Sequence, residues 1–586
     1  MINKYNIDEK DTKFKFDNYK KGFAYILNHK KKMIIVIILN FINIFFGLSL
    51  VKITEFLINT TLPNKDYNQL LFLVLGNLGI ALLMLVTSYF ARKALNELSQ
   101  DIMEKMRNDL FIHTQHLSTN FFDTRPNGKI LVRLTTYVNN VYGMLARDVP
   151  RLITSSLNIV LTVIFMFITN VSLSLFTFVG ILILSIVFLA TAKKKRSLQQ
   201  EVNNKGSNLT AYTVESIRGV SITQAFNREK ENEKIYSGLT GDLYDKVHKI
   251  MPYWNINWVV AWQIEDLTII LMYIIGFVYL FPTVAIGTVI AMASYSKRLW
   301  SPVRMIFSSF DELINSVTYL ERIFELLEEP IDIKNSDSSK KIQIKGNIKF
   351  DEVNFGYNKD KQVLKNVSFE IKPKTKVAFV GSTGSGKSTI VNLIERFYDT
   401  NSGAITIDGV NIKDIDLGSL RKQTTIMLQD NYLFTTSILD NIRYGNPKAT
   451  KNEVTEVCKK LKLHDWILGL EKGYDTVLSN NGKELSDGQR QLLSYARTII
   501  ANPKIIILDE ATSKIDTSTE KIIDKTLQVV LKDKTVIVIA HRLSTITNSD
   551  TIYYLSNGEI KESGSHKELM KKKSSYHKLF TSQNKV

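Results

Sequence analysis

Long apolar runs crowd the first half of this 586-residue chain, and charged segments lie between and after them. A helix needs about 20 apolar residues to cross roughly 30 Å of hydrocarbon. Soluble buried helices are the alternative for any one run, but six runs in succession, paired as hairpins, argue against it. The predicted membrane-spanning helices are Met33–Ile58, Leu70–Ala91, Ile153–Thr169, Val171–Ala192, Trp258–Phe281 and Pro282–Ser296.

Two long polar connections, Arg92–Arg151 and Lys193–Asn257, lack dense glycine or proline. They are too long for loops, so we expect them to extend the spanning helices into the cytoplasm. The bends fall near Phe121–Gly128 and Gln224–Glu229. A short transverse helix that exposes aromatic residues at each bend could dock into a soluble domain; the alternative is a solvated helical hairpin.

Basic residues predict the orientation. Lys30–Lys32 precedes the first span and Lys193–Arg196 follows the fourth. By the positive-inside rule, both termini and the long connections face the cytoplasm of a cell-membrane protein. The leader through Lys32 is polar and carries both charge signs, which argues against a cleavable signal. We expect a cytoplasmic segment at 1–32, a six-span domain at 33–330, a linker at 331–341 and a soluble domain at 342–586.

The formal net charge of +18 would suit nucleic acid binding. Lysine-rich segments beside apolar spans explain it equally well through attraction to anionic membrane lipid, and we expect no nucleic acid partner. The single cysteine, Cys458, excludes an intrachain disulfide and a cysteine-based metal site. We expect it to pack as a small apolar residue on a helix.

The soluble part contains a glycine-rich stretch, Gly381–Ser388, between the apolar run Val377–Val380 and a helix-like run, Thr389–Arg396. Strand, glycine loop and helix form the context of a phosphate-binding loop. Backbone N–H groups converge on phosphate oxygens there, and the helix dipole adds attraction. Lys387 can reach the terminal phosphates and the Ser388 hydroxyl can bind Mg²⁺. A nucleoside triphosphate is the predicted ligand.

Another apolar run, Ile505–Leu508, ends in the carboxylates Asp509 and Glu510. Such runs fit central parallel strands, whose carboxyl ends hold ligands. Asp509 would hold Mg²⁺, directly or through water, and Glu510 is placed to polarise the attacking water. A purely structural carboxylate pair is the alternative, which the upstream glycine loop disfavours.

Three more side chains follow predicted strands. His541 comes after Thr535–Ala540 and could contact the γ-phosphate, while Gln429 ends Thr425–Leu428 and could sense the metal through its amide. Tyr357 lies beside a β-rich start, where an aromatic face could stack on adenine.

These motifs, in this order, resemble an ATP-binding cassette (ABC) exporter half-transporter of the multidrug-resistance type, over essentially the whole chain. Gly381–Ser388 matches the Walker A motif, Gln429 the Q-loop and Leu485–Gln489 the signature. The segments Arg107–Val141 and Leu209–Glu229 resemble the family's coupling regions. The resemblance implies an all-α six-helix transmembrane domain fused to a cytoplasmic α/β P-loop ATPase domain.

In the same terms, Asp509 and Glu510 match Walker B and the catalytic base, Ser513–Asp516 the D-loop, and His541 the switch histidine. The resemblance implies a catalytic role for Glu510, His541 and Lys387, and Mg²⁺ held by Ser388, Gln429 and Asp509. The residues expected to contact ATP are Tyr357, Gly381, Ser382, Thr383, Gly384, Ser385, Gly386, Lys387, Ser388, Thr389, Gln429, Ser486, Gly488 and Gln489.

The family's sites form between two chains, each ATP lying between Walker A of one and the signature of the other. This chain has one set of motifs and no internal repeat, so it is expected to pair with a second half-transporter chain. ATP then closes the dimer, the cavity alternates between inward- and outward-facing states, and hydrolysis resets it. The implied function is ATP-driven export of amphipathic or hydrophobic small molecules.

Two positions depart from the family pattern. Asp487 replaces a signature glycine, and a carboxylate about 6 Å from the γ-phosphate would cost on the order of 3 kcal/mol per phosphate charge, more than about tenfold in affinity. Either Asp487 points away, or the site it helps to build is impaired. Asn480–Asn481 stands where a glutamate is common before Gly482. An intact Glu510 with an altered Asp487 favours one partner of a heterodimer; a homodimer that tolerates the change is the alternative.

Substrate identity rests on fewer signals. Lys52 and Glu55 lie one turn apart and could pair with each other, whereas Glu265 and Asp266 are the better candidates for meeting a cationic drug. A carboxylate that merely faces water is the alternative. Lipid and peptide export stay open, as does import. Two other classes are a soluble ABC ATPase acting on ribosomes or DNA, which the apolar runs oppose, and an ATP-regulated receptor or channel without turnover.

Overall fold

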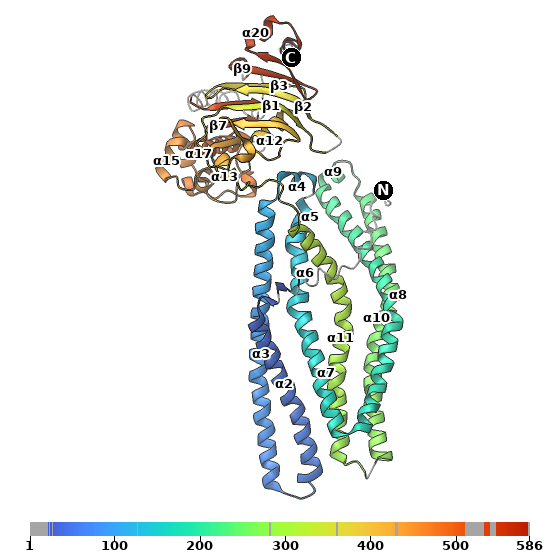
Figure 1. Ribbon diagram of the computed structural model, residues 1–586. Helices are drawn as coiled ribbons and strands as arrows, with labels where there is room; N and C mark the ends of the chain where they lie inside the picture. The colour runs from blue at the N-terminus through green and yellow to red at the C-terminus, as the bar shows by residue number, and fades with distance from the viewer. Residues whose placement is uncertain are drawn as a thin grey trace. The chain divides into compact units, whose positions relative to one another are not determined.

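A computed structural model describes residues 22, 24–25, 27–125, 127–280, 283–358, 361–427, 432–509, 533–539 and 546–583. The chain forms two compact units (Figure 1). The helical unit contains residues 1–115 and 127–329, and the sheet unit contains residues 116–126 and 330–586. The sheet unit therefore includes a short piece taken from the middle of the helical half.

Long helices build the helical unit, and several extend well beyond the thickness of a membrane. The helix α3 has 50 residues, which at 1.5 Å per residue makes it about 75 Å long. The predicted helical extensions of the spans are thus confirmed. The long helices are α2 (Lys30–Phe56), α3 (Tyr67–His116), α7 (Val149–Thr169), α8 (Val171–Arg218), α10 (Glu229–Ile274) and α11 (Ile286–Leu327).

Shorter elements complete this unit. A run of α5 (Asn127–Val132), η3 (Arg133–Tyr137), α6 (Val138–Gly143) and η4 (Met144–Asp148) leads directly into α7. The π-helical turns η2 (Leu57–Thr61) and η5 (Ile275–Tyr279) extend α2 and α10. At the second bend lies α9 (Val220–Ala225).

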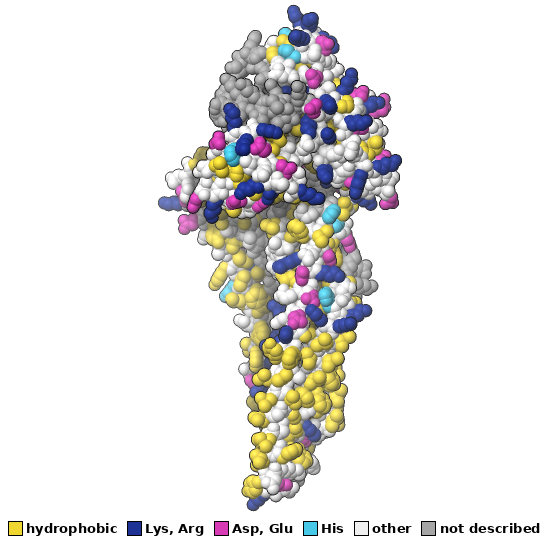
Figure 2. All heavy atoms as spheres, turned by 90° about the vertical axis from the view of Figure 1, so that its left-hand side faces the viewer, with side chains coloured by type: hydrophobic (Ala, Val, Ile, Leu, Met, Phe, Trp, Pro, Cys, Tyr) yellow, Lys and Arg dark blue, Asp and Glu magenta, His cyan; other side chains and the backbone are white. Residues whose placement is uncertain are grey.

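Within the described residues, five helices are long and apolar enough to cross a membrane; they contain the first four predicted spans in full and the fifth through Tyr279. The sixth predicted span falls in α11, whose apolar stretch ends at Lys297 and Arg298. This sixth span stays a prediction. Figure 2 shows hydrophobic side chains gathered along the lower part of the helical unit, as expected for surfaces that meet lipid or a second chain.

The core of the helical unit lies among α2, α7, α8, α10 and α11. Trp300 and Tyr295 of α11 are fully buried in it. Gly180 of α8 permits this packing, because a Cβ at that position would stand 3.1 Å from the Trp300 ring.

Two sheets form the sheet unit (Figure 1). The first is antiparallel, in the order β2-β1-β4-β5, with β1 (Ile348–Phe355), β2 (Leu364–Ile371), β4 (Ser402–Ile407) and β5 (Val410–Asn411). The second has the order β10-β9-β3-β8-β7-β6 and is parallel from β9 through β6. Its strands are β3 (Lys376–Gly381), β6 (Thr424–Met427), β7 (Ile505–Asp509), β8 (Thr535–Ile539), β9 (Thr551–Ser556) and β10 (Glu559–Gly564).

Helices complete three cores in this unit, one of which lies where α20 and α21 pack on β3, β8 and β9. The α12 helix (Lys387–Ile394) packs between the two sheets in one core, and a helical subdomain around α14, α15 and α17 forms another. Cys458 is buried on α15, so its predicted packing role is confirmed. The remaining helices are α13 (Leu417–Gln423), α14 (Ile438–Arg443), α15 (Lys451–Lys460), α16 (His464–Leu468), α17 (Asp487–Ala501), α20 (His566–Lys571) and α21 (Ser575–Gln583).

The predicted docking of the first bend is also confirmed. This bend forms the short helix α4 (Thr119–Thr124), which belongs to the sheet unit. Phe121 is buried, and the Asp123 carboxylate accepts a 2.6 Å hydrogen bond from the Tyr398 hydroxyl. The second bend stays with the helical unit, where Phe226, which follows α9, is 73% exposed.

Candidate functional site

The loop between β3 and α12 requires glycine at two positions. Gly381 has a φ of +155° and Gly386 a φ of +106°. A Cβ on Gly381 would stand 2.2 Å from the backbone oxygen of Leu555, and one on Gly386 would stand 2.6 Å from a methyl group of Leu364. Side chains are therefore excluded, and the backbone N–H groups of the loop lie open to an anion.

Lys387 begins α12 and folds back over the loop. Its ammonium group donates hydrogen bonds of 2.9 Å to the Gly381 carbonyl and 3.0 Å to the Ser382 carbonyl. The residue is 6% exposed, so the loop holds a buried positive charge beside the helix N-terminus. Phosphate oxygens would form stronger, charge-assisted bonds with this ammonium than neutral carbonyls do.

The hydroxyl groups around the loop differ in exposure. Ser388 is exposed in the first turn of α12, where its oxygen is available to a cation. Ser385 is buried, and its hydroxyl has no hydrogen-bond partner in the described part of the chain. Ser382, Thr383 and Gly384 are exposed along the rim. The loop thus offers a fitted cradle for phosphates and an oxygen ligand for Mg²⁺.

Tyr357 is anchored to α12 and still partly open. Its hydroxyl lies 3.2 Å from the Thr389 hydroxyl and accepts a 3.2 Å hydrogen bond from the Asn392 amide. The Tyr398 ring meets it edge-on at a centroid distance of 5.0 Å. Because 39% of Tyr357 remains exposed, the ring can offer a face to a planar base.

Strand register places Asp509 at the edge of the sheet where the glycine loop begins. β8 pairs in parallel with both β3 and β7, and Ile539 lies opposite both Phe379 and Asp509. Asp509 is therefore two strand spacings, about 10 Å, from the strand that enters the glycine loop. The register places the backbone of Asp509 at this edge, and the role of its side chain in holding Mg²⁺ stays a prediction.

Three predicted residues, Gln429, Glu510 and His541, lie outside the described residues, as do Ser513–Asp516. The strands that precede Gln429, Glu510 and His541 are β6, β7 and β8. The described ends of these strands are adjacent, because β7 pairs in parallel with both β6 and β8. Their roles stay predictions.

A second group of predicted residues lies elsewhere, at the start of α17 in the helical subdomain. The Ser486 hydroxyl accepts a 3.2 Å bond from the Gln489 N–H, and the Gln489 side chain accepts a 2.9 Å bond from the Ser486 N–H. This reciprocal cap fixes the turn that contains Gly488. Gly381–Ser388 and this turn therefore belong to different parts of the sheet unit.

Two family models match the chain. The ABC transporter transmembrane region matches residues 33–303, and the model described as ABC transporter matches residues 364–513. The ABC transporter ATP-binding protein YknV of Bacillus subtilis (strain 168) is 33% identical over 573 residues, which cover 96% of this chain and 93% of the relative. The chain belongs to the ABC transporter family.

Other comparisons place this ABC transporter among exporters. YgaD of the same organism, which is named for multidrug export, is 31% identical over 96% of this chain and 99% of that protein. A bacterial Atm1-family ABC exporter solved with ATP bound has a TM-score of 0.81 and 26% identity, over 95% of this chain and 99% of that chain. The transporter thus couples ATP hydrolysis to export, and such exporters act as dimers.

The altered signature of this transporter has a local explanation. Arg490 forms an ion pair with the Asp487 carboxylate, three residues away on α17. The same guanidinium donates to the carbonyls of Gly482 and Leu485 at 3.1 and 3.2 Å. Of the two alternatives for Asp487, this contact favours the one in which its charge is directed away from nucleotide. Asp487 and Arg490 lie three residues apart, and this spacing on a helix could have indicated their ion pair from the sequence.

Asn481 forms its hydrogen bond within its own sheet unit. It adopts a left-handed backbone with φ of +62°, which asparagine tolerates well. Its side-chain oxygen accepts a 2.7 Å bond from the Leu433 N–H. The side chain of Asn480 lies outside the described residues. Sequence reasoning also missed Asn392 and Tyr398, because neither belongs to a contiguous motif.

Charges in the transporter's helical unit correct one expectation. Lys52 and Glu55 pair at 2.7 Å, as predicted. Glu265 was expected to meet a cationic drug, but it is buried in an ion pair with Arg304, whose guanidinium also lies 4.1 Å from the Trp262 ring centroid. A cation from α11 already neutralises this carboxylate, so it is not available to a cationic substrate.

Proposed function

We propose that the chain exports amphipathic or hydrophobic small molecules across the cytoplasmic membrane by alternating access, as one half of a heterodimeric exporter. The observation that carries the proposal is the meeting of the glycine loop, Lys387 and the Asp509 strand end at one edge of a sheet, in a chain fused to long apolar helices. Export of lipid or peptide by the same architecture is the second candidate.

The chemistry follows from these positions. The Gly381–Ser388 loop binds the phosphates, Tyr357 stacks on adenine, and Lys387 neutralises charge that develops on the terminal phosphate. Ser388 and Asp509, with Gln429, would hold Mg²⁺, which when bound withdraws charge from the phosphate oxygens. Glu510 orients and deprotonates the attacking water, and His541 contacts the γ-phosphate.

The partner chain completes each site in this proposal. Ser486, Gly488 and Gln489 at the start of α17 would contact nucleotide bound to the partner, because the helix N-terminus attracts anions. The exposed α9 region, with Ile222 65% and Phe226 73% exposed, is available for the partner's sheet unit. Lysines and arginines beside the spans support cytoplasmic termini.

The decisive experiment measures ATPase activity and dye transport of the chain in lipid bilayers, alone and with a second half-transporter. Replacement of Glu510 by Gln is expected to lower turnover by about 100-fold or more with ATP binding retained, since a general base is lost. Replacement of the exposed Glu471 by Gln is the matched control and should change nothing.

Persistent turnover in Glu510→Gln would refute its assigned role. Turnover that is robust in the chain alone would refute the heterodimer and favour a homodimer. Turnover with no movement of any dye would oppose small-molecule export and favour the lipid or peptide alternative.

A further inference from the structure

Two buried carboxylates of the helical unit already have basic partners. Glu55 contacts Lys52, and Glu265 contacts Arg304. Arg298 of α11 differs: among the described residues, no carboxylate lies within ion-pair distance of its guanidinium. Arg298 lies just beyond the predicted sixth span and is half-buried, and a half-buried cation without an ion-pair partner is costly to keep, so its position requires either a partner or a function.

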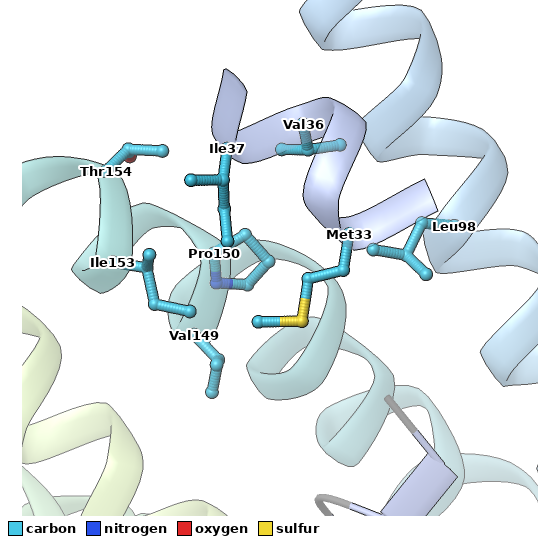
Figure 3. Close-up of a pocket in the computed structure, with 8 residues that line it drawn as sticks. All are labelled: Met33, Val36, Ile37, Leu98, Val149, Pro150, Ile153 and Thr154. Atoms are coloured by element: carbon cyan, nitrogen blue, oxygen red, sulfur yellow. The ribbon is translucent and has the colours of Figure 1, made fainter. Parts of the chain in front are cut away.

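Arg298 lines an open, polar cavity of about 330 Å³ between α7 and α11, which run side by side (Figure 1). Ser155 and Asn158 of α7 and Ser301 of α11 line it as well. A second pocket, among α2, α3 and α7, shows the contrast: Met33 and Ile37 point toward Pro150 there, and the space is about 10 Å³ (Figure 3). That apolar pocket has no room for a ligand, whereas the Arg298 cavity does.

The neighbouring helix makes room for the guanidinium. Arg298 Nη2 lies where a side chain on Gly47 of α2 would begin, 1.9 Å from an ideal Cβ. Glycine within a helix is less favourable than alanine, because it loses more conformational freedom on folding. Because Gly47 has no side chain, the Arg298 guanidinium can lie against α2, while Arg298 also lines the cavity.

The polar groups around this cation are suited to donate hydrogen bonds. The Asn158 side-chain oxygen already accepts a 3.0 Å bond from the Thr162 hydroxyl, which directs its amide N–H₂ to other partners. Ser155 and Ser301 add hydroxyl donors, and the guanidinium adds a planar fork of N–H groups. Guanidinium, amide and hydroxyl donors together match the oxygens of a carboxylate, sulfonate or phosphate.

We propose that the Arg298 cavity binds the anionic group of an amphipathic molecule and thereby selects anionic over cationic substrates. The proposal rests on the export function proposed above and specifies its substrate class. It differs from the expectation of a cationic drug, of whose two candidate carboxylates Glu265 is paired with Arg304 and Asp266 is exposed.

The test compares two xanthene dyes of opposite charge, carboxyfluorescein and tetramethylrhodamine methyl ester. Their binding is measured by fluorescence anisotropy, without ATP, to the full chain assembled with its partner in phosphatidylcholine nanodiscs. Arg298→Gln is expected to weaken binding of the anionic dye by about 10-fold to 100-fold, the range for charge-assisted hydrogen bonds. Binding of the cationic dye should stay constant or strengthen.

Lys297→Gln is the matched control, because it removes the same charge from an exposed neighbouring position outside the cavity. It should change neither dye's affinity by more than about threefold. Arg298→Lys keeps the charge and should restore part of the anionic binding. Equal losses for both dyes in Arg298→Gln, or none for either, would overturn the proposal; equal losses would indicate that Arg298 instead pairs with a carboxylate of the second chain.

Two further arms separate the sources of the anion and the two proposals. Phosphatidylglycerol in the nanodiscs should compete with carboxyfluorescein only in chains that retain Arg298 if the occupant is a lipid headgroup, and should have no effect if it is a soluble substrate. Dye transport into proteoliposomes tests export itself. Charge-selective binding without transport would refute export and leave the anion site standing, whereas transport without charge selectivity would refute only the anion site.

Discussion

The helical unit and the sheet unit hold their charges in different ways. In the helical unit, Glu265 of α10 meets Arg304 of α11, 39 residues away, in a buried environment. In the sheet unit, Asp487 meets Arg490 within one turn of one helix, and Lys387 bonds to carbonyls of its own loop. Breaking a pair across helices leaves a buried ion, whereas a pair within one partly exposed turn can be rehydrated. The Glu265–Arg304 pair and the Asp487–Arg490 pair should therefore respond very differently to loss of one charge.

Replacement of Glu265 by Ala is the strongest challenge to this contrast. It would leave the Arg304 guanidinium, whose side chain is 15% exposed, without its carboxylate. We expect a loss of about 3–5 kcal/mol in the free energy of unfolding of the helical unit. The change should appear as a lower thermal midpoint of the full chain in nanodiscs, followed by tryptophan fluorescence.

The control for this experiment removes both charges. A Glu265→Met, Arg304→Met variant should recover most of the lost stability, because apolar replacement of a buried pair is often neutral. If the double variant is no more stable than Glu265→Ala, then shape and packing, and not the ion pair, govern this site.

The sheet unit also contains a buried carboxylate, Glu395, whose raised pKa offers a second test. It is 3% exposed; one oxygen accepts a 3.0 Å bond from Thr424, and the other has no partner in the described part of the chain. Burial raises the pKa of Glu395 from 4.5 to about 7, although the Thr424 bond and the nearby Arg421 oppose the shift. The folded state thus binds a proton that the unfolded state has released between these two pKa values.

Stability should consequently fall as pH rises from about 4.5 to 7, by about 3 kcal/mol in total, and level off above that range. Glu395→Gln cannot ionise, so it should match the wild type near pH 4.5 and be more stable above pH 7. Amide hydrogen exchange of β3 peptides, corrected for the intrinsic pH dependence of exchange, measures the difference. The same pH dependence in both chains would show that Glu395 stays ionised in the fold.

The contrast between local and long-range contacts, both of which occur in each unit, also explains what could be predicted from the sequence. The glycine loop and the strand that ends at Asp509 were predictable, because each is a contiguous pattern with a local physical requirement. Lys52–Glu55 was predictable for the same reason, since its partners lie one helical turn apart. The positions of Gln429, Glu510 and His541 follow from the motifs alone and stay predictions.

Contacts set by packing between distant elements were not predictable. Arg304 reaches Glu265 only because α10 and α11 pack in one particular register, which no local spacing encodes. Tyr398 and Asp123 are 275 residues apart, so their hydrogen bond depends on how α4 joins the sheet unit. Gly47 was read only as part of an apolar span, although its missing side chain makes room for Arg298.

The smallest expected effect belongs to the local pair of Asp487 and Arg490. The Asp487 side chain is 41% exposed, and such pairs contribute at most about 1 kcal/mol. If Arg490 directs the carboxylate away from nucleotide, Asp487→Gly should change ATP affinity by less than about threefold, measured in a Glu510→Gln background. If the carboxylate instead faces the γ-phosphate, the same change should raise affinity more than tenfold.

A double-mutant cycle separates these outcomes. Arg490→Ala frees the Asp487 carboxylate from its partner, so it should weaken ATP binding by about tenfold through repulsion between like charges. Asp487→Gly added to Arg490→Ala should then restore affinity, although Asp487→Gly alone changes little. That pattern is a coupling between the two positions, because each substitution has an effect that depends on the other. Independent, additive effects would mean that Arg490 acts through its bonds to Gly482 and Leu485 and not through Asp487.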